Sequence, residues 1–127
     1  MPTPVERWVE QSQYDLDTAR AMLRSGRFLY VLFCCQQAVE KMLKGLIVKK
    51  TGEFPPRLHS LMRLAEAAGL TLDSPRADFL GELSAYYIQS RYPEEIEAMS
   101  EQVTIEIASD TLEKTEELLQ WLKSALP

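Results

Sequence analysis

The chain has few of the residues from which metal sites and disulfides are built: two cysteines and one histidine among 127 residues. Because Cys34 and Cys35 are neighbours, a helix cannot bring them into disulfide geometry without distortion. The cysteines and the histidine do not have the spacing of zinc ligands, and no glycine-rich phosphate loop is present. We therefore expect no disulfide framework, no metal site and no bound cofactor.

Long apolar runs are also lacking. The longest, residues 28–35, is far shorter than the segment needed to cross a bilayer. The first residues become charged at Glu6 and Arg7, unlike a signal peptide. With 46% hydrophobic and 26% charged residues, the composition is that of an ordinary soluble protein. We expect one cytoplasmic domain over residues 1–127, with a single hydrophobic core and no membrane association.

Basic residues are scarce in the last third of the chain. Residues 81–127 carry three Lys or Arg against ten Asp or Glu, whereas residues 1–50 carry eight against five. The acidic region argues against DNA binding and against broad nucleic-acid binding, which both need a basic surface. A local phosphate site in the first half of the chain remains compatible with these charges.

Helical periodicity and end signals run through the whole sequence. Thr3, Pro4 and Glu6 form a capping signature before the first helix, and glycines follow the expected ends of three helices. The expected helices cover about residues 3–25, 28–51, 59–68, 74–90 and from about 100 onward. Residues 103–107 alternate like a strand, but no partner strand exists elsewhere. We expect an all-α, antiparallel up-and-down bundle of about five helices.

The second expected helix contains an unusual polar run, Gln36-Gln37-Ala38-Val39-Glu40-Lys41-Met42-Leu43-Lys44. Helical spacing puts Gln37, Lys41 and Lys44 on one face, and Glu40 precedes Lys44 by the four residues that favour an ion pair. These residues form either a solvated face with one ion pair or the lining of a site. The remaining surface of this helix is so widely apolar that we also expect a dimer interface.

Two other places offer polar groups to chemistry. Arg91 follows the fourth helix, where it either caps helix carbonyls or offers its guanidinium to a phosphate beside Tyr86, Tyr87 and Tyr92. His59, the single histidine, either caps or packs at the start of the third helix, or serves in catalysis with a partner in reach.

Three segments together resemble the HEPN domain family. They are the Gln36–Lys44 run, Leu58-His59-Ser60-Leu61 after a proline-containing connector, and Tyr87-Ile88-Gln89-Ser90-Arg91-Tyr92-Pro93. The resemblance implies an all-α bundle that is usually a homodimer. Members are often encoded beside a small nucleotidyltransferase, several such pairs act as toxin and antitoxin, and many members are metal-independent RNases.

The RNase members use an arginine followed, after four to six residues, by a histidine. Arg91 matches the arginine, but positions 96, 97 and 98 hold Ile96, Glu97 and Ala98. Without this histidine the family's usual acid–base help, which typically contributes a hundredfold or more, is lost. The resemblance therefore indicates a protein that is not an RNase of the usual kind.

The resemblance also favours a polar pocket between the second and fourth helices over a scattered surface. Its expected lining is Gln37, Glu40, Lys41, Lys44, Tyr87 and Arg91. In this interpretation Glu40 orients Arg91 by an ion pair, and the lysines face an anion. A purely structural polar network would give the same sequence, and that alternative stays open.

Three functional hypotheses follow. The first is a non-catalytic module that binds a nucleotide, RNA or a nucleotidyltransferase partner. The second is a metal-independent RNase toxin that uses Arg91 with an atypical partner, His59 or Tyr92. The third is a purely structural dimeric helical protein.

Overall fold

The computed structural model describes residues 1–126, and these form an all-helical bundle, which confirms the expected fold class. Six α-helices and one short 3-10 helix follow one another along the chain: α1 (Pro4–Arg24), α2 (Phe28–Thr51), α3 (Leu61–Ala67), α4 (Ser74–Ser84), η1 (Ile88–Ser90), α5 (Pro93–Gln102) and α6 (Ile105–Lys123). Within residues 1–126, no helix combines the length and the apolar character that crossing a membrane requires.

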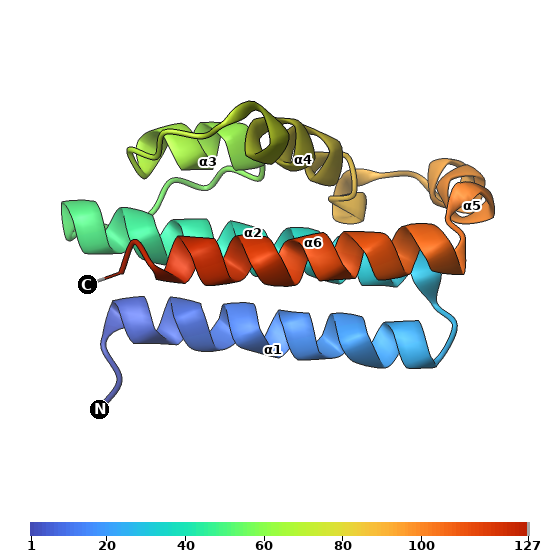
Figure 1. Cartoon of the computed structure of the whole chain (residues 1–127). Helices are drawn as coiled ribbons and strands as arrows, with labels where there is room; N and C mark the ends of the chain where they lie inside the picture. Colours follow the sequence, from blue (N-terminus) through green and yellow to red (C-terminus); the bar gives the residue numbers. More distant parts are fainter. Residues whose placement is uncertain (127) are drawn as a thin grey trace.

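The three long helices lie side by side (Figure 1). α1 runs antiparallel to α2 and α6, whereas α2 and α6 run in the same direction. In the sequence, α3, α4, η1 and α5 lie between α2 and α6. They carry the chain back along the side of α2 that faces away from α1, from the C-terminal end of α2 to the start of α6. This return path places the segment before α3 and the η1 segment against the same helix, α2.

α2 is the centre of the core. It packs against α1 most extensively, then against α6, and also against α3, α4 and α5. Most of its side chains are buried, including Leu32, Cys35 and Val39, whereas Tyr30 is 45% exposed and Phe33 is half-buried. The chain's own helices therefore cover most of the wide apolar surface that suggested an interface on α2, which weakens this argument for a dimer.

The ends of α1 and α2 follow the sequence signals. Thr3 Oγ1 accepts a hydrogen bond from the Glu6 amide at 3.1 Å, and Glu6 Oε2 accepts one from the Thr3 amide at 3.3 Å. Gly52 ends α2 in the left-handed conformation, with φ of 72°. Pairing of the two helices depends on Gly45, where an added Cβ would lie 3.2 Å from Trp8 Cβ.

The expected boundaries of the third and fourth helices need correction. Helix α3 begins at Leu61 rather than near residue 59, because Ser60 caps it. Helix α4 is capped by Asp73 and ends at Ser84, about six residues before the expected end. The reason is tertiary: Ser84 Oγ accepts a hydrogen bond from the Leu61 amide at 3.1 Å, which ties the end of α4 to the start of α3.

The sequence interpretation was wrong in placing one helix from about residue 100 onward. A separate helix, α5, begins at Pro93, and residues 103 and 104 are non-helical and separate it from α6. Thr104 caps α6, since its Oγ1 accepts a hydrogen bond from the Ile107 amide at 3.2 Å. The strand-like alternation of residues 103–107 is thus a buried Val103 followed by a helix cap.

Candidate functional site

A buried carboxylate, Glu40 in the middle of α2, is the centre of the polar cluster. Gln36 Nε2 donates to Glu40 Oε1 at 2.9 Å, and Lys44 Nζ donates to Oε2 at 3.0 Å. These two partners stand four residues before and after Glu40, so one helix face supplies three members of the network. His59 Nδ1 lies 3.1 and 3.2 Å from the two carboxylate oxygens. A buried charge is tolerated when it is paired and hydrogen-bonded in this way.

His59 belongs to the segment between α2 and α3. Because carboxylate oxygens only accept hydrogen bonds, the Nδ1 that faces Glu40 carries a proton, and Nε2 is the acceptor of the neutral ring. The ring stacks on Tyr87, with centroids 3.9 Å apart and planes 13° from parallel. The His59 side chain is 46% exposed, so the network reaches solvent at this imidazole.

The stacked pair continues an aromatic row along one edge of α2. Tyr87 lies 6.4 Å from Phe33, and Phe33 lies 6.3 Å from Tyr30 in an edge-to-face arrangement. Aromatic contacts of this geometry stabilise by roughly 0.5–1.5 kcal/mol beyond simple burial. The row fixes the position of Tyr87, and Tyr87 in turn holds the open side of the network at His59.

The two lysines expected to face an anion both have carboxylate partners. The Lys44 side chain is 11% exposed, and its ammonium also lies 5.8 Å from the centre of the Trp8 ring. Lys41 Nζ lies 2.7 Å from Asp15 Oδ2, an ion pair without the alignment of a hydrogen bond, which joins α2 to α1. Gln37 Nε2 donates to Gln36 Oε1 at 2.7 Å. Each of these three side chains is thus engaged in contacts within the bundle.

Arg91 caps α4. Its Nη2 donates to the carbonyl of Ala85 at 3.1 Å, and its Nη1 donates to Glu95 Oε2 at 3.2 Å. Across residues 1–126, the expected ion pair between Glu40 and Arg91 is not formed, because each side chain is held by other partners. Tyr92 is 72% exposed and is the N-cap residue of α5.

The structure thus brings Glu40, Lys44, His59 and Tyr87 together, and gives Lys41, Arg91 and Tyr92 other surroundings. Sequence reasoning missed the role of Gln36, although its spacing of four residues from Glu40 was a usable signal. No local signal links His59 to Glu40, because the contact spans 19 residues and depends on the connector.

A histidine held by a buried carboxylate has two chemical uses. Its free nitrogen accepts a hydrogen bond from a ligand, or it takes up a proton in catalysis. Among the described residues, no group of three or more potential ligands is placed to hold a metal ion.

Two solved structures are similar to this chain over nearly its whole length. The crystal structure of TT1696 from Thermus thermophilus is 26% identical and has a TM-score of 0.81, over 96% of this chain and 98% of that one. The crystal structure of ST0689, an archaeal HEPN homologue, is 27% identical with a TM-score of 0.70, over 99% and 100%. The comparison with curated proteins gave no match. The sequence profile of the HEPN domain matches residues 5–125, so the chain belongs to the HEPN domain family.

Proposed function

We propose that this HEPN domain is a non-catalytic binding module that takes a nucleotide or single-stranded RNA on the face formed by His59 and Tyr87. The observation that carries the proposal is the half-exposed imidazole of His59, fixed by Glu40 on one side and by the Tyr87 ring on the other. A fixed, flat and partly exposed ring pair suits a planar base, because stacking tolerates any base and needs little reorganisation.

Hydrogen bonding and charge complement the stacking surface. In the neutral ring, His59 Nε2 accepts a hydrogen bond, which suits an amino group on a base. Arg91 uses two of its nitrogens on Ala85 and Glu95 and retains further N–H donors for a phosphate. The lysines at positions 41 and 44 are neutralised by carboxylates and contribute to the fold.

The absence of the family's usual histidine supports a binding role. Positions 96–98 lie on α5, where Ile96 is half-buried and Glu97 is exposed. α5 carries four glutamates and no basic residue, so its surface repels a polyanion. This helix therefore supplies no histidine for proton transfer and no attraction for a ribose phosphate.

Fluorescence anisotropy with labelled single-stranded RNA octamers tests the proposal, with AMP, ATP and GTP as competitors. We expect His59→Ala and Tyr87→Leu each to weaken binding by about tenfold, since stacking on an aromatic side chain contributes roughly 1–3 kcal/mol per base. The matched control is Tyr14→Ala, which removes a tyrosine that is 69% exposed on α1. No saturable binding, or equal losses in the control, would overturn the proposal.

A second candidate function is a metal-independent RNase that uses the His59–Glu40 pair. The specific observation in its favour is that Glu40 contacts Nδ1, so Nε2 is the nitrogen left to exchange a proton with a ribose hydroxyl. Purified protein is incubated with RNA and EDTA, and compared with His59→Gln and Arg91→Ala. The candidate fails if the RNA stays intact, or if all three proteins cut it equally.

The proposal includes a homodimer and a small nucleotidyltransferase as partner, because the family resemblance implies both. Co-purification with a nucleotidyltransferase encoded beside this gene tests the partner. The purely structural alternative predicts a different result: Lys44→Ala and Arg91→Ala would lower the melting temperature and leave all binding unchanged.

A further inference from the structure

An open hollow lies beside α1, apart from the His59–Tyr87 face. It has a volume of about 890 Å³ and is lined by Pro4, Arg7, Trp8 and Gln11 of α1, by Val48 of α2, and by Gly52, Glu53 and Phe54 after α2. Of these residues, only Trp8 also contacts the Glu40 network, through the Lys44 ammonium. Volumes of this size are typical of small-molecule sites, which combine apolar walls with a few polar groups.

Two aromatic side chains line this hollow. Trp8 is half-buried and held in place, because its Cβ sits over Gly45 and its ring lies near the Lys44 ammonium. Phe54 is 99% exposed, and Pro55 and Pro56 follow it. Burying an exposed phenylalanine against an apolar ligand is favourable, because it removes apolar surface from water. The two prolines restrict the backbone conformations that this segment can adopt. The pair suits a flat, aromatic ligand.

The charged groups at the hollow point to an anionic substituent. Across residues 1–126, the Arg7 side chain has no ion pair and no hydrogen bond, so its planar fork is free for a carboxylate, sulfonate or phosphate. Glu53 also lines the hollow but is not paired with Arg7 within residues 1–126. Its carboxylate repels additional negative charge, which disfavours polyphosphates, while the Arg7 guanidinium can still bind one anionic group.

The hollow between α4 and α6 is different. Its volume is about 550 Å³, and its two basic residues already pair with carboxylates: Arg76 with Asp73, and Lys114 with Asp110 outside the lining. A ligand there would have to displace existing ion pairs.

We propose that the hollow of Trp8, Phe54 and Arg7 is a binding site for a small planar aromatic compound that carries a single anionic group. The ring lies against Trp8 and is covered by Phe54, and the anionic group accepts hydrogen bonds from Arg7. This site is independent of RNA or nucleotide binding at His59.

Trp8 itself reports binding in a Trp121→Phe variant, because Trp121 is the second tryptophan and packs against Arg76 on the α6 side. The probe is anilinonaphthalene sulfonate, and N-phenyl-1-naphthylamine is its analogue without the sulfonate. We expect saturable energy transfer from Trp8 to the probe. Arg7→Ala should weaken the sulfonate by about tenfold, as expected for a charge-assisted hydrogen bond, and change binding of the neutral analogue less than twofold.

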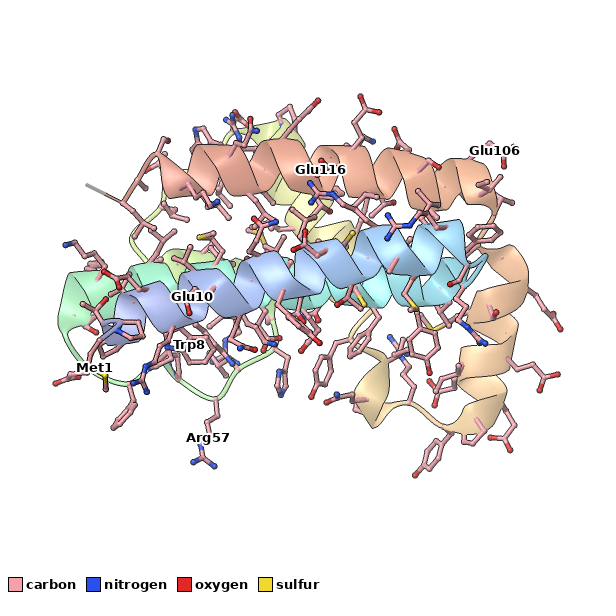
Figure 2. All side chains as sticks on the ribbon, turned by 90° about the horizontal axis from the view of Figure 1, so that it is seen from below. Met1, Trp8, Glu10, Arg57, Glu106 and Glu116 are labelled. Carbon is pink, nitrogen blue, oxygen red and sulfur yellow. The ribbon has the colours of Figure 1, made fainter. Side chains whose placement is uncertain are left out.

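Matched variants distinguish binding at this site from nonspecific binding of the hydrophobic probes elsewhere on the protein. Phe54→Ala should weaken both probes, and its nearly full exposure means that the fold does not depend on it. Arg57→Ala is the control: Figure 2 shows Arg57 projecting from the segment between α2 and α3, and it does not line the hollow. The proposal is overturned if no saturable binding occurs, or if Arg7→Ala and Arg57→Ala act alike. RNA binding by Arg7→Ala, expected to be unchanged, keeps the outcome distinct from that of the proposed function.

Discussion

At the scale of single residues, Glu40 matters most to the interior. Its 5% exposed carboxylate balances Lys44 and receives hydrogen bonds from Gln36 and His59. We expect Glu40→Gln, which keeps the shape and removes the charge, to lower the free energy of unfolding by about 3 kcal/mol, because the Lys44 ammonium is left buried without its partner. Urea denaturation measures the change.

The control for this variant is Glu95→Gln, which removes the partner of Arg91. That pair is exposed, at 37% for Arg91 and 45% for Glu95, so the expected loss is below about 1 kcal/mol. Similar losses in both variants would mean that the Glu40 network contributes no more than a surface ion pair.

The two cysteines give a pH dependence. Burial raises the pKa of the Cys34 thiol to about 11 and that of the Cys35 thiol to about 12, from an ordinary value of 9.0. Above pH 9 the unfolded chain therefore binds fewer protons than the folded protein, so stability falls as pH rises towards 11. Urea midpoints between pH 8 and pH 11 should fall more steeply for the wild type than for a Cys34→Ala, Cys35→Ala variant.

At the scale of elements, the caps decide where helices begin. Thr104 separates α5 from α6, and its hydroxyl oxygen accepts the amide of Ile107. We expect Thr104→Ala to cost about 1 kcal/mol of stability. Thr71→Ala, at an exposed position outside the helices, is the control. Equal melting temperatures for the two variants would contradict a capping role.

A helix boundary can be predicted from the sequence when the residues that set it lie next to it in the chain. Helix α1 has a local capping box at its start, α2 has a local stop at Gly52, and the predicted ranges of both helices agree with the structure. Helix α5 also has a local signal, Pro93 followed by two glutamates in the first turn, which the interpretation overlooked. The end of α4 could not be read locally, because it depends on contacts of Ser84 with α3 and of Arg91 with Ala85.

The same distinction applies to the candidate site. The Glu40–Lys44 pair was expected from a spacing of four residues, and the structure contains it. The partners of Arg91 and the position of His59 depend on how the connector and η1 pack against α2. Those contacts join residues far apart in the sequence, and helical periodicity carries no information about them.

At the scale of the whole molecule, charge limits how RNA can bind. The net charge is −5 and α5 is acidic, so Arg91, four residues after Tyr87 in the sequence, is the phosphate ligand in our proposal. Each neutralised phosphate of a single strand contributes about −0.7 to the slope of log affinity against log salt. We expect a slope near −0.7 between 50 and 200 mM salt, and no competition from duplex DNA. A slope steeper than about −3 would contradict this face.

Assembly is a second prediction at this scale. Light scattering at micromolar concentration should give about 29 kDa, twice the 14.5 kDa of one chain. Because most of α2 is covered within the chain, we expect the interface to use mainly other surfaces. A mass of one chain would contradict the expected dimer.

The parallel arrangement of α2 and α6 has a consequence for synthesis on the ribosome. α1 and α2 are neighbours in the sequence and can pair as soon as both are synthesised. The side of α2 that packs on α6 is covered only after the last helix has been made (Figure 1). The 72 residues that follow Thr51, up to Lys123, take roughly 4 to 14 s to translate at about 5–20 residues per second. During that interval an apolar stripe of the nascent chain stays uncovered, so α2 is the segment where a chaperone would bind the growing polypeptide.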